Sequence, residues 1–197
     1  MNLPNKLSCF RMAIVPLIVL VMLFPYAQFS IAMPDFQFGF VTLPLKNILV
    51  LVLFAIASFT DFLDGHIARS RNLITSFGKF IDPIADKLLV NTMFVMFAAT
   101  AVVPVVPVVI MIWRDTIVDG LRMNAAQKGK VVAAGFLGKL KTVTQMLAII
   151  VILLNNLPFE LVRFPMSDFL LWFATLISVA SGISYFMQLK VIIMESM

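Results

Sequence analysis

The sequence predicts an all-α integral membrane protein with six transmembrane helices, both termini in the cytoplasm and a single domain over residues 1–197. Of the 197 residues, 61% are hydrophobic and 13% are charged, whereas a soluble domain is about half apolar and about one quarter charged. The chain contains several apolar runs, and their lengths approach the roughly 20 residues that a helix needs to cross a bilayer. A water-soluble domain and a disordered chain are therefore excluded, and the lone Cys9 excludes a disulfide scaffold.

The predicted spans follow from these runs in order. The first covers residues 12–33; a signal peptide would also begin with a basic residue and an apolar run, but equally hydrophobic segments follow, which favours an uncleaved span. The second begins near residue 45 and reaches the polar block at Asp61. Residues 88–113 form one long run that contains Pro104 and Pro107. Because proline removes a backbone donor and disfavours a continuous helix, this run predicts two spans.

The last two spans are predicted over residues 140–154, with a start as early as residue 136, and over residues 167–193. In this arrangement, all but two of the 15 basic residues lie on the side of the termini; the exceptions are Lys46 and Arg163. Cytoplasmic loops of membrane proteins carry an excess of Lys and Arg. We therefore expect a multi-pass protein of the inner or plasma membrane, with that basic side in the cytoplasm.

Two acidic pairs lie where the second and third spans meet. Asp61 and Asp64 end the second span, and Asp82 and Asp86 open the third. Spacings of three and four residues place each pair on one helix face, and a hairpin brings both pairs together. Capping of helix ends is the alternative, but the helix dipole disfavours carboxylates at a helix carboxyl end.

Four close carboxylates repel one another and need compensating charge. Mg²⁺ prefers oxygen ligands and shares its shell with substrate phosphates, and a two-metal cluster suits phosphoryl displacement. Gly65 and Ala68 leave space beside the acids, Gly78 allows close backbone approach, and Arg69 offers a planar fork to a phosphate. The pattern thus favours a cluster of two divalent ions that acts on a substrate phosphate.

The motif D-x2-D-G-x2-A-R-x8-G-x3-D-x3-D over residues 61–86 resembles the signature of the CDP-alcohol phosphatidyltransferases. The resemblance implies six transmembrane helices, a homodimer and a cytoplasmic active site that transfers a phosphatidyl group and releases CMP. It implies that two Mg²⁺ or Mn²⁺ ions are held by Asp61, Asp64, Asp82 and Asp86. It further implies that Asp86 is the catalytic base and that the CDP-lipid is bound by Gly65, Ala68, Arg69 and Gly78.

Further basic residues lie in two later segments. Arg114, Asp115, Asp119 and Arg122 fall on one stripe of a helix, and a polar stripe in an apolar helix favours a wet cavity over lipid. With Lys139 and Lys141, these arginines suit an acceptor that carries a phosphate. Ordinary positive-inside charges are the alternative for all four.

These segments, together with the amino-terminal residues 2–11 and residues 181–186 at the close of the sixth span, resemble bacterial phosphatidylglycerophosphate synthases. The resemblance implies transfer from CDP-diacylglycerol to sn-glycerol 3-phosphate, with Asn5, Ser8 and Arg11 on the CDP-lipid side. Asp115 and Asp119 depart from the glutamate and small hydroxyl residue expected there. Inositol phosphate, serine or phosphatidylglycerol as acceptor, a cation transporter and a non-catalytic lipid-binding protein stay open as alternatives; no nucleic-acid partner is expected.

Overall fold

The computed structural model describes residues 2–70, 75–127 and 135–194, and for some helical residues beside these gaps it describes the backbone alone. The described chain is mostly helical. Its α-helices are α1 (Leu3–Leu23), α2 (Leu45–Ser70), α3 (Ser76–Ala99), α4 (Val105–Gln127), α5 (Phe136–Leu153) and α6 (Met166–Met194). Short 3-10 helices cover Tyr26–Phe29 and Phe159–Val162. The predicted break between the third and fourth helices is confirmed, because α3 ends at Ala99 and Pro104 directly precedes α4.

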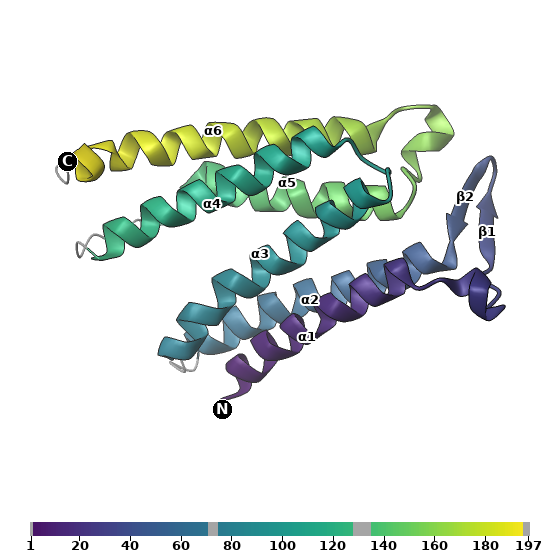
Figure 1. The fold of residues 1–197 in the computed structure, drawn as a ribbon, viewed down its shortest axis with the longest axis horizontal. Helices are drawn as coiled ribbons and strands as arrows, with labels where there is room; N and C mark the ends of the chain where they lie inside the picture. Colours follow the sequence, from purple (N-terminus) through teal and green to yellow (C-terminus); the bar gives the residue numbers. More distant parts are fainter. Residues whose placement is uncertain (1, 71–74, 128–134, 195–197) are drawn as a thin grey trace.

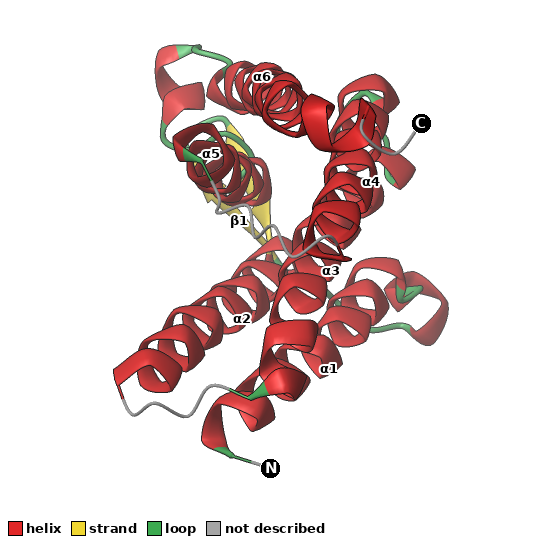
Figure 2. Ribbon diagram, turned by 90° about the vertical axis from the view of Figure 1, so that its left-hand side faces the viewer, coloured by secondary structure: helices red, strands yellow, loops and turns green. Residues whose placement is uncertain are grey.

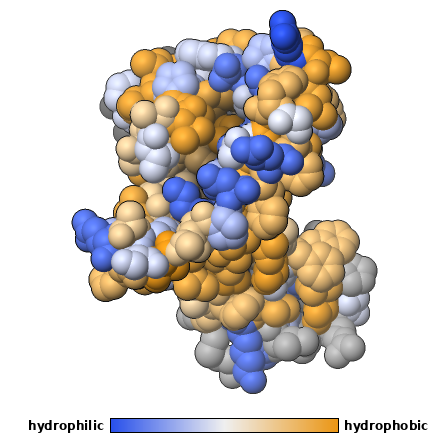
Figure 3. All heavy atoms as spheres, turned by 90° about the vertical axis from the view of Figure 1, so that its right-hand side faces the viewer, coloured by the Kyte–Doolittle hydropathy of each residue, from blue (hydrophilic) through white to orange (hydrophobic). Residues whose placement is uncertain are grey.

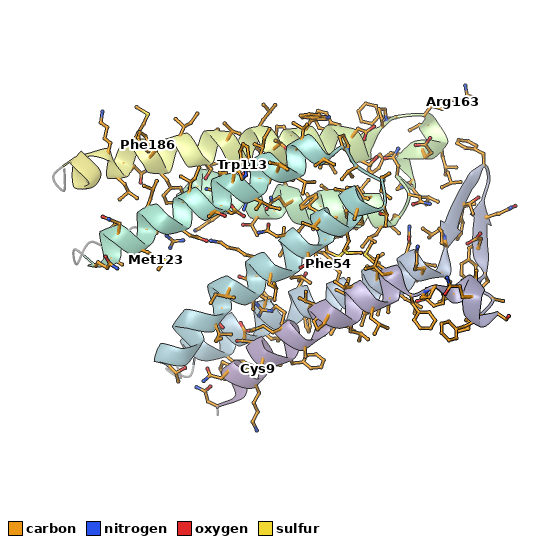
Figure 4. All side chains as sticks on the ribbon, in the orientation of Figure 1. Cys9, Phe54, Trp113, Met123, Arg163 and Phe186 are labelled. Carbon is orange, nitrogen blue, oxygen red and sulfur yellow. The ribbon has the colours of Figure 1, made fainter. Side chains whose placement is uncertain are left out.

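The helices form two groups of three, one built from α1, α2 and α3 and the other from α4, α5 and α6 (Figures 1 and 2). In the first group α1 packs against both α2 and α3, and in the second α6 packs against both α4 and α5. One apolar core joins the groups: Ile18, Phe54 and Met93 belong to the same buried cluster as Met111 and Ile149. Phe54, labelled in Figure 4, is 1% exposed.

Four of the described helices are long and apolar enough to cross a membrane, over Pro4–Leu23, Leu45–Gly65, Phe136–Leu153 and Met166–Lys190. Large apolar side chains such as Trp113 and Leu176 are exposed on the outside of the bundle, and apolar atoms cover much of the face in Figure 3. These features fit a membrane-embedded protein. The helices α3 and α4 carry more charged residues and do not meet the same test, so the count of six spans stays a prediction.

The segment between α1 and α2 differs from the expectation. The first helix begins at Leu3, where the Asn2 side chain caps it, and ends at Leu23, two residues before Pro25. The predicted span to residue 33 is therefore wrong at both ends. Strands β1 (Asp35–Phe38) and β2 (Val41–Pro44) then form an antiparallel hairpin, whose turn contains Gly39 at φ 63°. This hairpin interrupts an otherwise helical chain.

Both described ends of the chain lie at the end of the molecule opposite the hairpin (Figure 1). Lys46 lies in the first turn of α2, next to the hairpin, and Arg163 lies at the same end (Figure 4). The two basic residues that the sequence separates from the others are thus also separated in space. Which end faces the cytoplasm stays a prediction.

Candidate active site

Three carboxylates from two helices converge on one arginine of α1. Arg11 Nη1 lies 2.8 Å from Asp61 Oδ1, and Arg11 Nη2 lies 2.5 Å from Asp64 Oδ2. Arg11 Nη1 also donates to Asp86 Oδ1. The Arg11 side chain is 0% exposed, so its charge is compensated by these carboxylates rather than by water. The structure therefore brings the acids of α2 and α3 together, as the hairpin predicts. However, α2 continues to Ser70 and α3 begins at Ser76, so both acidic pairs lie inside their helices rather than at the ends.

The fourth aspartate joins the cluster through a serine of α1. Ser8 Oγ donates to Asp82 Oδ1 at 2.6 Å and lies 3.3 Å from Asp64 Oδ2. Ser8 is buried, and its hydroxyl bridges the acids of both helices. All four predicted metal ligands thus meet within one cluster, which we call the acidic cluster: Asp61, Asp64, Asp82 and Asp86.

Residues at successive spacings of three on α1 supply this contact face: Asn5, Ser8 and Arg11. Asn5 Oδ1 accepts a hydrogen bond from Thr75 Oγ1 at 3.0 Å, and Thr75 Oγ1 in turn accepts from Gly78 N at 3.0 Å, which caps α3. A Cβ atom at Gly78 would lie 3.1 Å from Asn5 Oδ1 and 3.3 Å from Thr75 Oγ1. Gly78 therefore leaves room for the close approach of α3 to α1, and a larger residue would need these side chains to shift.

The remaining predicted CDP-lipid residues lie at the end of α2. Gly65 is half-buried one residue after Asp64. The side chains of Ala68 and Arg69 lie outside the described part of the structure. Their predicted contacts with the nucleotide stay predictions.

The chemistry of the acidic cluster fits hard divalent cations, which prefer carboxylate oxygens. Four carboxylates against the one guanidinium of Arg11 leave a formal charge of three negative (−4 + 1 = −3) among these groups. Among the described residues, no three acidic, histidine or cysteine side chains are arranged around a shared ion position. Oxygens of Asp61, Asp64 and Asp86 instead face Arg11. The oxygen ligands that a metal would need are therefore close together, with the guanidinium between them.

A second buried cluster links α4, α5 and α6. Lys141 Nζ donates to both Asp115 Oδ1 and Asp115 Oδ2 at 2.6 Å, and Arg114 Nη1 donates to Asp115 Oδ1 at 2.9 Å. Arg114 Nη2 donates to Ser181 Oγ at 2.6 Å. Two of the predicted acceptor residues, Arg114 and Lys141, are therefore held by the carboxylate of Asp115. Asp115 belongs to the predicted stripe, but no role is predicted for it.

Arg114 is fixed on its other sides by α6. Its Cζ atom lies 5.6 Å from the ring centroid of Tyr185, and a Cβ atom at Gly182 would lie 3.0 Å from Arg114 Cγ. Within the part of the chain that the structure describes, the buried Arg114 Nε has no hydrogen-bond partner. The close of the sixth span enters the prediction through family resemblance alone, without a role for Ser181 or Tyr185.

The other two predicted acceptor residues lie apart from this buried cluster. Arg122 and Lys139 are exposed. Asp119, a possible partner of Arg122, forms an ion pair with Lys87 of α3 instead. This pair connects the two helix groups, and Lys87 directly follows Asp86 in the chain. The residues of the predicted α4 stripe thus lie in two places. Arg114 and Asp115 lie in the interior, and Asp119 lies at the boundary with α3.

Comparison with known proteins agrees with the signature. Residues 1–180 match the family model for CDP-alcohol phosphatidyltransferase. The chain is 43% identical to the CDP-diacylglycerol–glycerol-3-phosphate 3-phosphatidyltransferase of Bacillus subtilis, over 94% of this chain and 93% of that protein. It is 35% identical to the protein of the same name from Rickettsia bellii, over 96% of each chain.

A third relative with this name, from Salmonella choleraesuis, is 35% identical over 75% of this chain and 74% of its own length. The family match over residues 1–180 contains the acidic cluster, the contact face of α1 and the α4 stripe. The chain belongs to the CDP-alcohol phosphatidyltransferase family and is an enzyme of that family.

Proposed function

We propose that the protein transfers the phosphatidyl group of CDP-diacylglycerol to sn-glycerol 3-phosphate, giving phosphatidylglycerophosphate and CMP. The proposal rests on similarity over 94% and 96% of the chain to relatives named for this activity, combined with an acidic cluster that has the donor chemistry of a diphosphate site. We further propose that the protein lies in the inner or plasma membrane with the acidic cluster at the cytoplasmic face, and that it forms a homodimer.

Asp61, Asp64, Asp82 and Asp86 would hold two Mg²⁺ or Mn²⁺ ions, which when bound neutralise negative charge on the diphosphate and on the attacked phosphoryl group. Asp86 accepts the proton of the acceptor hydroxyl. The hydroxyl oxygen then bonds to the phosphorus nearest the lipid, and the bond from that phosphorus to the bridging oxygen breaks to release CMP. The Asp86 side chain is 43% exposed, whereas that of Asp64 is 3% exposed, which supports Asp86 as the base that meets the acceptor.

The acceptor phosphate is assigned to the basic residues of α4 and α5. Arg114 and Lys141 carry two positive charges, whereas the one carboxylate that both contact, that of Asp115, carries a single negative charge. The buried Arg114 Nε also has no acceptor among the described residues. An arginine fork suits phosphate oxygens. Arg122 and Lys139 are exposed and lie within one or two turns of these residues along their helices, so they would contribute charge at the entrance.

Other acceptors within the same chemistry are inositol phosphate, serine and phosphatidylglycerol. A cation transporter is the candidate from another class, since acidic residues inside helices also occur along ion pathways. The acidic cluster lies in the carboxyl-terminal half of α2 and the amino-terminal half of α3, which are consecutive in the chain. This placement favours an enzyme acting at one membrane face.

The test is CMP release by the purified protein with CDP-diacylglycerol, Mg²⁺ or Mn²⁺, and each acceptor offered singly. We expect release with glycerol 3-phosphate. Release with inositol phosphate or serine alone would retain the mechanism and refute the acceptor. No release with any acceptor would refute the enzyme proposal.

A further inference from the structure

Arg11 is an unusual cation because it is fully buried and is shared by three acids. The carboxylates of Asp61, Asp64 and Asp86 come from α2 and α3, and each contacts a terminal nitrogen of the same guanidinium. Carboxylates of two helices that approach this closely repel one another unless a cation lies between them. Arg11 therefore lets α2 and α3 bring their acids together without a bound metal.

The same oxygens cannot serve the guanidinium and a metal ion at full strength. Arg11 faces Asp61 Oδ1, Asp64 Oδ2 and Asp86 Oδ1, and a divalent ion among these oxygens would repel the nearby positive charge. Loading of the site thus requires that Arg11 give up some of these contacts.

Arg11 also has unused hydrogen-bonding capacity. Its Nε atom is buried and has no hydrogen-bond partner among the described residues, and a buried donor without an acceptor is unfavourable. A guanidinium binds phosphate oxygens through two parallel hydrogen bonds. A diphosphate that enters beside the acidic cluster would offer Arg11 the acceptors that replace the released carboxylates.

We propose that Arg11 is the resident counter-ion of the unloaded site, which exchanges its carboxylate partners for the diphosphate of the CDP-lipid when divalent ions bind. This inference rests on the proposed function for the identity of the donor and the ions. It makes Arg11 a positioning residue: in the unloaded protein it keeps the metal ligands in place and competes with the metal for them.

The experiment measures Mn²⁺ binding to the purified full-length protein in detergent, from the loss of the free-ion electron paramagnetic resonance signal. Wild type is compared with Arg11→Gln, with and without CDP-diacylglycerol. Lys87→Gln is the matched control. It also removes one positive charge, and Lys87 follows Asp86 in the chain, but the Lys87 ammonium pairs with Asp119 rather than with the acidic cluster. Without the donor, we expect Arg11→Gln to bind Mn²⁺ at least about tenfold more tightly than wild type, because the competing cation is gone.

The donor should reduce this difference to about threefold or less, because in wild type the guanidinium has then left the carboxylates. We expect the affinity of Lys87→Gln to stay within about threefold of wild type in both conditions. Thermal unfolding gives a second readout: Arg11→Gln should melt below wild type in EDTA and regain the difference when Mn²⁺ is added.

Equal Mn²⁺ affinity of Arg11→Gln and wild type without the donor would overturn the counter-ion role and leave the proposed function intact. Absence of Mn²⁺ binding to wild type even with the donor would refute the proposed metal site, and the inference with it. If Arg11→Gln cannot be purified in either buffer, Arg11→Lys decides. The lysine side chain is shorter and ends in one nitrogen, so it cannot occupy both positions that Arg11 Nη1 and Nη2 take against the carboxylates. Tighter Mn²⁺ binding than wild type is therefore expected, and unchanged binding overturns the proposal.

Discussion

Replacement of Asp115 by asparagine tests the buried cluster between α4, α5 and α6. The substitution keeps the size of the side chain and removes the charge that faces Lys141 and Arg114. The side chains of Asp115 and Lys141 are 4% and 8% exposed, so water cannot replace the lost carboxylate. We therefore expect the two cations to be left without their buried counter-charge.

The size of the effect follows from this burial. Removal of one partner from a buried ion pair costs about 3–5 kcal/mol. Asparagine still offers one oxygen to Lys141 Nζ, so the lower end, about 3 kcal/mol, is expected for Asp115→Asn. For a chain of this length, 1 kcal/mol corresponds to about 2–4 °C, which gives a decrease in melting temperature of about 6–12 °C.

The assay is thermal unfolding in detergent, followed by circular dichroism of the helices. Asp119→Asn is the matched control, because its ion pair with Lys87 is formed by side chains that are 40% and 31% exposed. Such a pair contributes about 0–1 kcal/mol. The double variant Asp115→Asn/Lys141→Met should recover part of the loss, because it removes the stranded ammonium group as well.

Two results would refute this reasoning. A melting temperature of Asp115→Asn that falls no further than that of Asp119→Asn would show that Asp115 does not neutralise a buried cation. A double variant as unstable as the sum of its single variants would show that Asp115 and Lys141 do not interact.

Four further outcomes are expected from CMP-release kinetics. Asp86→Asn should lower turnover by at least about 10²-fold while the melting temperature stays near that of wild type, because a positioned base is lost; near-normal turnover would exclude this role. Arg114→Ala and Arg122→Ala should each raise the apparent KM for glycerol 3-phosphate by about tenfold, as expected for a lost charged contact; an equal rise for CDP-diacylglycerol would assign them to the donor. Gly78→Ala should raise the apparent KM for CDP-diacylglycerol by about fivefold or more, because the added Cβ crowds Asn5; unchanged kinetics would show that this contact yields freely. EDTA should abolish CMP release, and Mg²⁺ or Mn²⁺ should restore it; activity that persists in EDTA would contradict metal dependence.

Much of the helical framework could be predicted from local signals. Apolar runs locate the helices, and Pro104 marks the turn between α3 and α4 because it cannot continue a hydrogen-bonded ladder. The spacings of Asp61–Asp64 and Asp82–Asp86 place each pair on one helix face. Because a hairpin brings these two helices side by side, the four acids are predicted to meet. Resemblance alone places Asn5, Ser8 and Arg11 of α1 on the CDP-lipid side. Ser8 and Arg11 contact the acids and Asn5 contacts Thr75, while their role in lipid binding stays a prediction.

The details that escaped prediction depend on contacts between distant segments. Nothing near Arg11 in the sequence indicates that its guanidinium lies between three carboxylates that follow more than 45 residues later. Asp119 has Arg122 three residues away, yet it pairs with Lys87 because α3 packs against α4. The β1–β2 hairpin over Asp35–Pro44 lies between the first two predicted spans, in a segment for which the all-α prediction included no strand.

The acidic cluster with its arginine is built entirely from α1, α2 and α3, and the Asp115 cluster entirely from α4, α5 and α6. On the proposed assignment, each half of the polypeptide recognises one substrate, and the reacting atoms meet at the seam. A change of acceptor alcohol during evolution would then need replacements only in the carboxyl-terminal half, while the nucleotide chemistry is inherited unaltered. Chimeras that exchange the last three helices between relatives with different acceptors should accordingly carry the acceptor preference with the transplanted half.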